Sequence, residues 1–165
     1  MSALFNNPAT RLAVEKNLLN VAVQDGYAGI DLELESLAPA DQFIFTKYAT
    51  TVMPISKILL GLAAYGYDWN TTTGASATDC SIPTIDALIA QYHVTPSWDS
   101  TNAAPYFTYT DASGDSHTVY YENSASLEPK LQLATQFNLA GVAIWQAGSE
   151  SQAFLGTLQA WAGSA

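Results

Sequence analysis

The stretch SKILLGLAAYG, residues 56–66, is a short apolar run followed by a glycine-containing turn. An apolar run of this length, bounded by a predicted helix and a turn, predicts a fully buried strand over 57–63. The segment AGVAIWQAG, residues 140–148, predicts a second buried strand over 140–146 in the same way. A third strand is predicted over 28–34, within GYAGIDLELESL at residues 26–37. Polar groups lie at or just beyond the C-terminal ends of all three strands, where α/β proteins place their sites.

Predicted helices alternate with these strands. Apolar residues recur at helical spacing in several segments, and Pro39 suits the first turn of one of them. Such an alternation implies parallel strands joined by helical crossovers, so the predicted fold class is α/β. The predicted helices cover residues 9–24, 39–53, 82–92, 124–138 and 151–161.

Residues 94–122 have a different character. The segments VTPSWD, PYFTYTD and HTVYYEN are aromatic and β-branched, and ASGD between the last two is a hairpin-type turn. We therefore predict a small antiparallel sheet here, preceded by a polar linker over 70–81. The resulting division is a β/α core over 1–70 and 124–165, interrupted by an α+β insertion over 71–123.

Composition narrows the classes of function. The chain of 165 residues has 15 Asp and Glu against 5 Lys and Arg, a formal net charge of −10. This charge argues against nucleic acid and anionic membranes as partners. No apolar run approaches the length of about 20 residues that a membrane span needs, and the N-terminus lacks a signal-peptide pattern. His93 and His117 lack metal-ligand spacing, and Cys80 is better suited to packing than to nucleophilic attack, so we expect no metal or cofactor.

Three acids alternate with apolar residues in the strand over 28–34 and just beyond it. Asp31, Glu33 and Glu35 would point to one face, because side chains on a strand alternate. Three carboxylates on one face repel one another, and a buried one loses its hydration. The alternative is that the three acids form the solvated face of an edge strand.

The segments GYAGIDLELE, KILLGLAAYGYDW and GVAIWQAGSE resemble, in this order, three signature strands of family-18 glycoside hydrolases. These are chitinase-like (β/α)8 barrels, and the resemblance is to their bacterial branch of peptidoglycan and spore-cortex N-acetylglucosaminidases. PYFTYTDASGDSHTVYYEN resembles the small insertion of that branch. The resemblance implies a shortened, TIM-barrel-derived parallel sheet with a small antiparallel α+β insertion.

The resemblance also implies roles for the acids. Glu35 corresponds to the general acid that protonates the glycosidic oxygen, while the substrate's own N-acetyl carbonyl acts as nucleophile. Glu33 would hold the acetamido N–H, and Asp31 would share a proton or hydrogen bond with it. Two positions depart from the family pattern, because Ala28 replaces an acid and Glu33 replaces an Asp.

Aromatic residues complete the implied site. Trp145 would form an apolar floor under the reacting sugar, and the alternative for it is packing in the core. Tyr65, Tyr67, Asp68 and Trp69 would line the rim. The remaining tyrosines of the insertion are predicted to pack within the sheet rather than to bind sugar; they are Tyr106, Tyr109, Tyr120 and Tyr121.

The chain is short for a complete barrel, which needs roughly 200 residues or more. Only residues 36–56 separate Glu35 from Lys57, which leaves room for one helix. Three functions stay open: a hydrolase of N-acetylglucosamine-containing polysaccharides, a non-catalytic carbohydrate-binding protein, and a self-associating structural protein. A partial barrel would expose strand edges, so we expect self-association. The implied substrates predict an extracellular or cell-envelope location, with no signal peptide in this chain.

Overall fold

The computed structural model describes residues 7–26 and 54–163. The chain divides into two compact units, residues 1–58 and 59–165. The first unit contains helix α2 (Pro8–Gln24), which agrees with the predicted helix over 9–24. Asn7 caps this helix, because its side-chain oxygen accepts hydrogen bonds from the N–H groups of Ala9 and Thr10. The predicted strand over 28–34 and helix over 39–53 lie outside the described residues.

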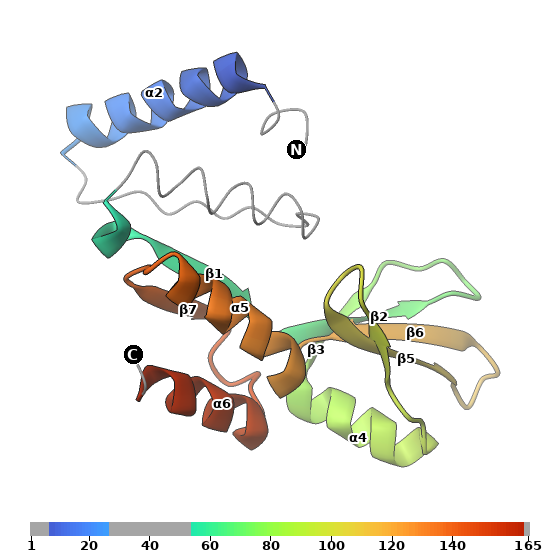
Figure 1. Ribbon diagram of the computed structural model, residues 1–165. Coiled ribbons are helices and arrows are strands. Elements are labelled where there is room, and N and C mark those ends of the chain that lie inside the picture. The colour runs from blue at the N-terminus through green and yellow to red at the C-terminus, as the bar shows by residue number, and fades with distance from the viewer. Residues whose placement is uncertain (1–6, 27–53, 164–165) are drawn as a thin grey trace. The chain divides into compact units, whose positions relative to one another are not determined.

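The second unit contains a sheet of two parallel strands, which lie side by side in Figure 1. Strand β1 (Leu59–Ala63) pairs with β7 (Gly141–Trp145), and the register places Leu59 opposite Gly141 and Ala63 opposite Trp145. The predicted parallel arrangement is therefore confirmed for these two strands, but their predicted full burial is wrong, because Leu59 and Trp145 are exposed among the described residues and only Leu62 of the two strands is buried. The first strand begins later than the sequence predicts, because residues Ile55–Lys57 form the 3-10 turn η1.

Two helices cover the parallel pair and close its core. Helix α5 (Ser124–Gln136) packs on β1 and β7, and α6 (Gln152–Ala162) packs on α5. A reciprocal pair of hydrogen bonds between Asn123 and Ser126 caps α5 at its N-terminus. Six buried residues form the core cluster of this region: Leu62, Ala64, Ile82, Leu127, Leu131 and Phe154.

The chain segment between β1 and α5 forms an antiparallel sheet of five strands in the order β3-β2-β6-β5-β4. The hairpin of β5 and β6 turns at Gly114, which has a φ of 90°, so the predicted sheet and its glycine turn are confirmed. Two of the strands were not predicted: one covers the residues expected to line the rim of the sugar site, and the other lies in the predicted polar linker over 70–81. These are β2 (Tyr65–Asn70) and β3 (Thr78–Ser81); the others are β4 (Ser97–Asp99), β5 (Ala104–Thr110) and β6 (Ser116–Tyr121).

The two missed strands have simple physical explanations. Strand β3 lies at the edge of the sheet and pairs on one side only, so its sequence TDCS needs no apolar alternation. Strand β2 follows β1 after a single residue, Ala64, so no turn marks where one sheet ends and the other begins. The antiparallel sheet thus begins at Tyr65, whereas the sequence predicts the insertion from residue 71.

Helix α4 (Ile82–Tyr92) covers one face of the antiparallel sheet (Figure 1). It agrees with the predicted helix over 82–92, and Ser81 caps it by accepting a hydrogen bond from the N–H of Thr84. Ile85 of the helix packs against Phe107, Val119 and Tyr121 of the sheet. Among residues 7–26 and 54–163, no helix is both long and apolar enough to cross a bilayer.

Candidate functional site

Trp145 marks the C-terminal end of the parallel pair. Its side chain is 63% exposed, so it does not pack in the core as the alternative interpretation requires. The backbone oxygen of Trp145 accepts a hydrogen bond from the N–H of Ala64 at 2.6 Å. This bond ties the end of β7 to the residue that joins β1 to β2. Trp145 and the first residues of β2 therefore lie at the edge where α/β proteins bind ligands.

Three of the predicted rim residues lie on one face of β2. Tyr65, Tyr67 and Trp69 occupy alternate positions, so their side chains point the same way. The ring centroids of Tyr65 and Tyr67 are 5.5 Å apart, and those of Tyr67 and Trp69 are 5.7 Å apart. Tyr67 is 40% exposed and Trp69 is 37% exposed, so both rings can be reached by a ligand.

The row of rings continues across the neighbouring strands. Trp69 meets Tyr120 of β6 edge-on at 6.2 Å, and Tyr120 stacks on Tyr106 of β5 at 5.1 Å. The strand register places Tyr67 beside Tyr120 and Tyr120 beside Tyr106, on the side of the sheet opposite α4. We call these five residues the aromatic face: Tyr65, Tyr67, Trp69, Tyr106 and Tyr120.

All four insertion tyrosines pack within the sheet as predicted, Tyr109 and Tyr121 on the helix-covered side and Tyr106 against Tyr120 on the other side. Tyr121 is buried against the helix-covered side, and Tyr109 packs there too. Tyr106 and Tyr120 lie on the opposite side and are only half-buried. The hydroxyl of Tyr120 donates a hydrogen bond to Asp99 of β4 at 3.2 Å. Burial, followed by this bond, raises the pKa of Tyr120, so the hydroxyl stays protonated.

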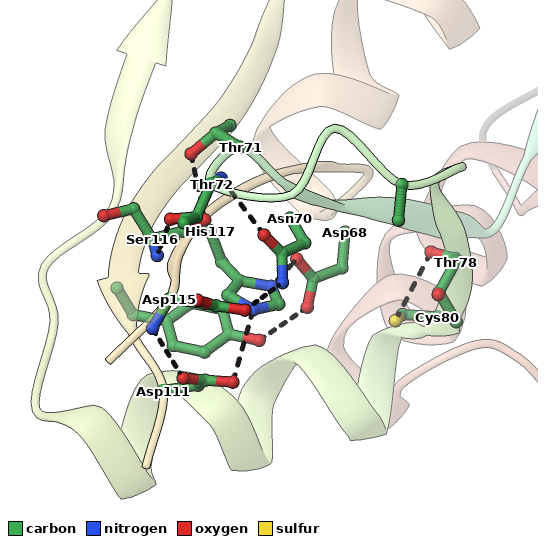
Figure 2. A network of polar contacts seen from close by, with 12 residues as sticks. Asp68, Asn70, Thr71, Thr72, Thr78, Cys80, Asp111, Asp115, Ser116 and His117 are labelled. Carbon is green, nitrogen blue, oxygen red and sulfur yellow. Dashed lines mark hydrogen bonds and ion pairs between the residues drawn. The ribbon is translucent and has the colours of Figure 1, made fainter. Parts of the chain in front are cut away.

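Asp68 lies in a polar network (Figure 2), and the alternation of β2 places it on the side of the sheet opposite the aromatic face. One carboxylate oxygen lies 2.8 Å from Nδ1 of His117, and the other accepts a hydrogen bond from the Tyr109 hydroxyl at 2.6 Å. The His117 ring stacks on the Tyr109 ring at 4.7 Å. Its Nε2 is buried and lies 3.7 Å from a carboxylate oxygen of Asp111, and it has no hydrogen-bond partner among the described residues.

Burial and a hydrogen bond keep one member of this network, the Tyr109 hydroxyl, protonated. Burial raises the pKa of Tyr109, and its hydrogen bond to Asp68 adds to the effect, so the hydroxyl remains a donor. Both carboxylate oxygens of Asp68 thus face groups of the protein itself. The structure brings Tyr65, Tyr67 and Trp69 together on one side of β2. Asp68 lies on the other side of the strand, where it contacts Tyr109 and His117.

The predicted acids Asp31, Glu33 and Glu35 lie outside the described residues. Burial raises the pKa of the Cys80 thiol, with nearby Asp68 and Asp79 adding to it, which disfavours the thiolate that a nucleophile needs. The described residues contain no group of three or more His, Cys, Asp or Glu side chains placed to hold a metal ion.

Sequence reasoning missed Tyr106, Tyr120 and Asp99 as neighbours of the rim. The two-residue alternation within β5 and β6 would have predicted that Tyr106 and Tyr120 share one face of their hairpin with Thr108 and Thr118. What joins them to Trp69 is the pairing of β6 with β2, which no local pattern specifies.

Comparison with known proteins gives consistent matches. The family model "Glycosyl hydrolases family 18" matches residues 39–150. The cortical fragment-lytic enzyme of Bacillus subtilis (strain 168) is 37% identical over 105 residues, which cover 62% of this chain and 24% of that protein. A chitinase from Chromobacterium violaceum has a TM-score of 0.65 at 32% identity, covering 71% of this chain and 36% of that one. The spore cortex-lytic enzyme SleL of Bacillus cereus has a TM-score of 0.68 at 27% identity, covering 79% and 30%. The matched region thus spans about a quarter to a third of these relatives.

Proposed function

Because this chain belongs to family 18 of the glycosyl hydrolases, we propose that it hydrolyses β-1,4-linked N-acetylglucosamine polymers, chitin or peptidoglycan. The observation that carries the proposal is the exposed Trp145 at the C-terminal edge of a parallel pair, inside a match to the family model. The relatives, a chitinase and two cortex-lytic enzymes, support both substrate classes for the proposal.

Glu35 is the general acid in this proposal. It protonates the glycosidic oxygen while the carbonyl oxygen of the substrate's acetamido group attacks the anomeric carbon, and the bond to the leaving oxygen breaks. Water then completes hydrolysis, and the Glu35 carboxylate takes back a proton. Glu33 orients the acetamido group through its N–H, and Asp31 shares a proton or hydrogen bond with Glu33. Trp145 offers its ring to the apolar face of the reacting sugar.

Hydrolysis of a fluorogenic chitobioside tests the proposal. We expect Glu35→Gln to lower the rate by about 10²-fold or more, because it removes the proton donor. Glu128→Gln, an exposed position on α5, is the matched control and should keep the wild-type rate. Equal rates in the wild type and Glu35→Gln would exclude the proposed mechanism.

A second candidate function is carbohydrate binding without hydrolysis. Two sequence departures favour it: Ala28 replaces an acid of the family pattern, and Glu33 carries its carboxylate one methylene further than the usual Asp. A displacement of about 1 Å in an orienting group can cost about 10²-fold in rate. Calorimetry with N-acetylglucosamine oligomers separates the two functions, since heat of binding without released product would favour the second.

A further inference from the structure

Helix α4 covers the antiparallel sheet, but its first residue is buried in the core of the parallel pair. We propose that this residue, Ile82, is a positioning residue for Trp145. It fixes the β7–α6 loop, residues 146–151, and so sets how the Trp145 ring meets the sugar. The inference rests on the proposed function for the role of Trp145, but the contacts that carry it lie within the second unit and involve no ligand.

The first observation is the burial of Ile82. Its side chain is 1% exposed and packs in the core cluster of the parallel pair, with Leu127 and Phe154. Ile85 is equally inaccessible, but it packs against the antiparallel sheet. Residues three apart are neighbours on a helix surface, so one turn of α4 joins the two cores. Truncation of Ile82 therefore acts on the parallel pair, whereas truncation of Ile85 acts on the sheet.

The second observation is how the N-terminus of α4 is capped. A helix leaves its first N–H groups without partners inside the helix. The Ser81 hydroxyl accepts a hydrogen bond from the N–H of Thr84 at 3.3 Å, and Pro83 has no N–H. The N–H of Ile82 donates to the backbone oxygen of Ser149 at 2.9 Å. The β7–α6 loop thus supplies the acceptor for the first N–H of α4.

The third observation is the short path from Ser149 to Trp145. The N–H of Ser149, a buried residue, donates to the Gln146 oxygen at 3.2 Å, which closes a turn directly after Trp145. Ala64 holds the start of this turn through its hydrogen bond to the Trp145 oxygen, and Ile82 holds its far end. Loss of the Ile82 contact leaves the turn anchored only at its start, so the exposed ring can shift with the backbone that carries it.

The kinetic signature of such a shift differs from that of simple unfolding. A ring under the sugar contacts both the bound substrate and the transition state, so a misplaced ring raises KM more than it lowers kcat. A smaller folded fraction has another effect, because fewer active molecules lower the apparent kcat and leave KM unchanged. The ratio of the two effects therefore separates a positioning role from a purely structural one.

Amide hydrogen exchange, followed by NMR, tests the contact in the unmutated full-length protein. We expect the amides of Ile82 and Ser149 to exchange at least about 10²-fold more slowly than unprotected amides, because both are hydrogen-bonded where the chain is buried. An Ile82 amide that exchanges as fast as an unprotected one would overturn the proposal.

Three variants separate the N–H of Ile82 from its side chain. Ile82→Ala truncates the side chain and keeps the N–H, Ile82→Pro removes the N–H, and Ile82→Val keeps both. Ser81, with φ −65° and ψ 153°, already has a backbone that suits a following proline.

We expect Ile82→Ala and Ile82→Pro to speed Ser149 exchange by about tenfold or more. KM for a fluorogenic chitobioside should increase by up to about tenfold, which corresponds to one good aromatic contact. Ile82→Val should stay within about twofold of the wild type in both measurements, because it keeps the N–H and most of the side chain.

Ile85→Ala is the matched control, since it makes the same truncation on the same helix. It should speed exchange in β5 and β6 but leave KM and Ser149 exchange at their wild-type values. Equal effects of Ile82→Ala and Ile85→Ala on Ser149 exchange would overturn the proposal, and so would unchanged Ser149 exchange in Ile82→Pro. Far-ultraviolet circular dichroism verifies that each variant is folded. Where Ile82→Ala does not fold, Ile82→Pro and exchange in the unmutated protein decide.

The tests of the two proposals are separable. Chitobioside hydrolysis with KM and Ser149 exchange that do not depend on Ile82 rejects only the positioning role. Absence of hydrolysis in the wild type rejects only the enzymatic proposal. The affinity for N-acetylglucosamine oligomers, measured by calorimetry, then replaces KM in the comparison of Ile82→Ala with Ile85→Ala.

Discussion

Asp68 joins three strands of the antiparallel sheet through its carboxylate. It lies on β2, and its partners Tyr109 and His117 lie on β5 and β6. Hydrogen bonds to an ionised group contribute about 1.5–3 kcal/mol each, and a buried group left without its partner loses its solvation as well. Because Trp69 and Tyr67 flank Asp68 on the same strand, this network also fixes the backbone that carries the aromatic face.

A double-mutant cycle measures the network. We expect Asp68→Ala to lower the free energy of unfolding by about 2–3 kcal/mol and Tyr109→Phe by about 1 kcal/mol, with the double variant less destabilised than their sum by about 1 kcal/mol. Urea unfolding gives the values. Tyr106→Phe, on the opposite side of β5, is the control and should be additive with Asp68→Ala. Additivity of Asp68→Ala with Tyr109→Phe would contradict the predicted coupling.

Tyr109 also predicts a loss of stability at alkaline pH. Burial and then Asp68 raise its pKa in the folded protein above the value of about 10 for an unfolded chain. A raised folded-state pKa contributes stability that is complete below the unfolded pKa and is lost as pH rises beyond it. Between pH about 8 and about 11, the unfolding free energy of the wild type should therefore fall more than that of Tyr109→Phe. Parallel curves for the two proteins would contradict this assignment.

At the scale of the element, β2 connects two sheets of different kinds. It follows β1 after one residue, but it pairs within the antiparallel sheet and not with the parallel pair. Its aromatic side chains lie on one side of the sheet, and Asp68 lies on the other. Gly66 lies on the side of Asp68, where Ile85 of α4 and the backbone of β6 approach closely. The close approach of helix and sheet there depends on the missing side chain.

Gly66→Ala tests this close approach. An added Cβ would lie 2.5 Å from the Tyr121 Cβ, 2.6 Å from the Tyr120 oxygen and 2.7 Å from the Ile85 Cδ1. We expect a loss of about 1–3 kcal/mol in unfolding free energy, because backbone atoms have to move. Gly61→Ala in β1 is the matched control; its Cβ would meet nothing within 4 Å, so its effect should stay within about 0.5 kcal/mol. Equal effects in thermal or urea unfolding would contradict the packing described at Gly66.

At the scale of the whole molecule, the parallel sheet has two strands within the described residues. Parallel strands are usually covered on both faces and extended at both edges. Leu59 is 59% exposed and Trp145 is 63% exposed, which leaves apolar surface at both ends of the pair. The exposed side chains of Leu59 and Trp145 support the expectation of self-association, which remains a prediction.

Light scattering across a range of micromolar concentrations checks that prediction. We expect the mean mass to increase with concentration, and the melting temperature should increase with it, because association stabilises only the folded chain. A constant monomer mass over that range would contradict self-association.

Local sequence patterns predicted much of the molecule. Helical spacing predicted α2, α4, α5 and α6, and short apolar runs predicted β1 and β7, because these signals come from neighbouring residues. The resemblance of KILLGLAAYGYDW and GVAIWQAGSE to family 18 led to Trp145 and the rim residues. The three acids stay a prediction, since they lie outside the described residues.

Only the tertiary structure decided which side chains meet. Asp68 belongs to the same sequence motif as Tyr67 and Trp69. Because side chains alternate along β2, it points to the other side of the sheet from these two rings. Tyr120 and Tyr106 reach Trp69 because β6 pairs with β2 across a long stretch of chain. Such pairing results from burying one face of the sheet under α4, a contribution that no short segment contains. The sequence alone determined the family and the predicted helices and strands other than β2 and β3, and the packing determined which residues share a surface.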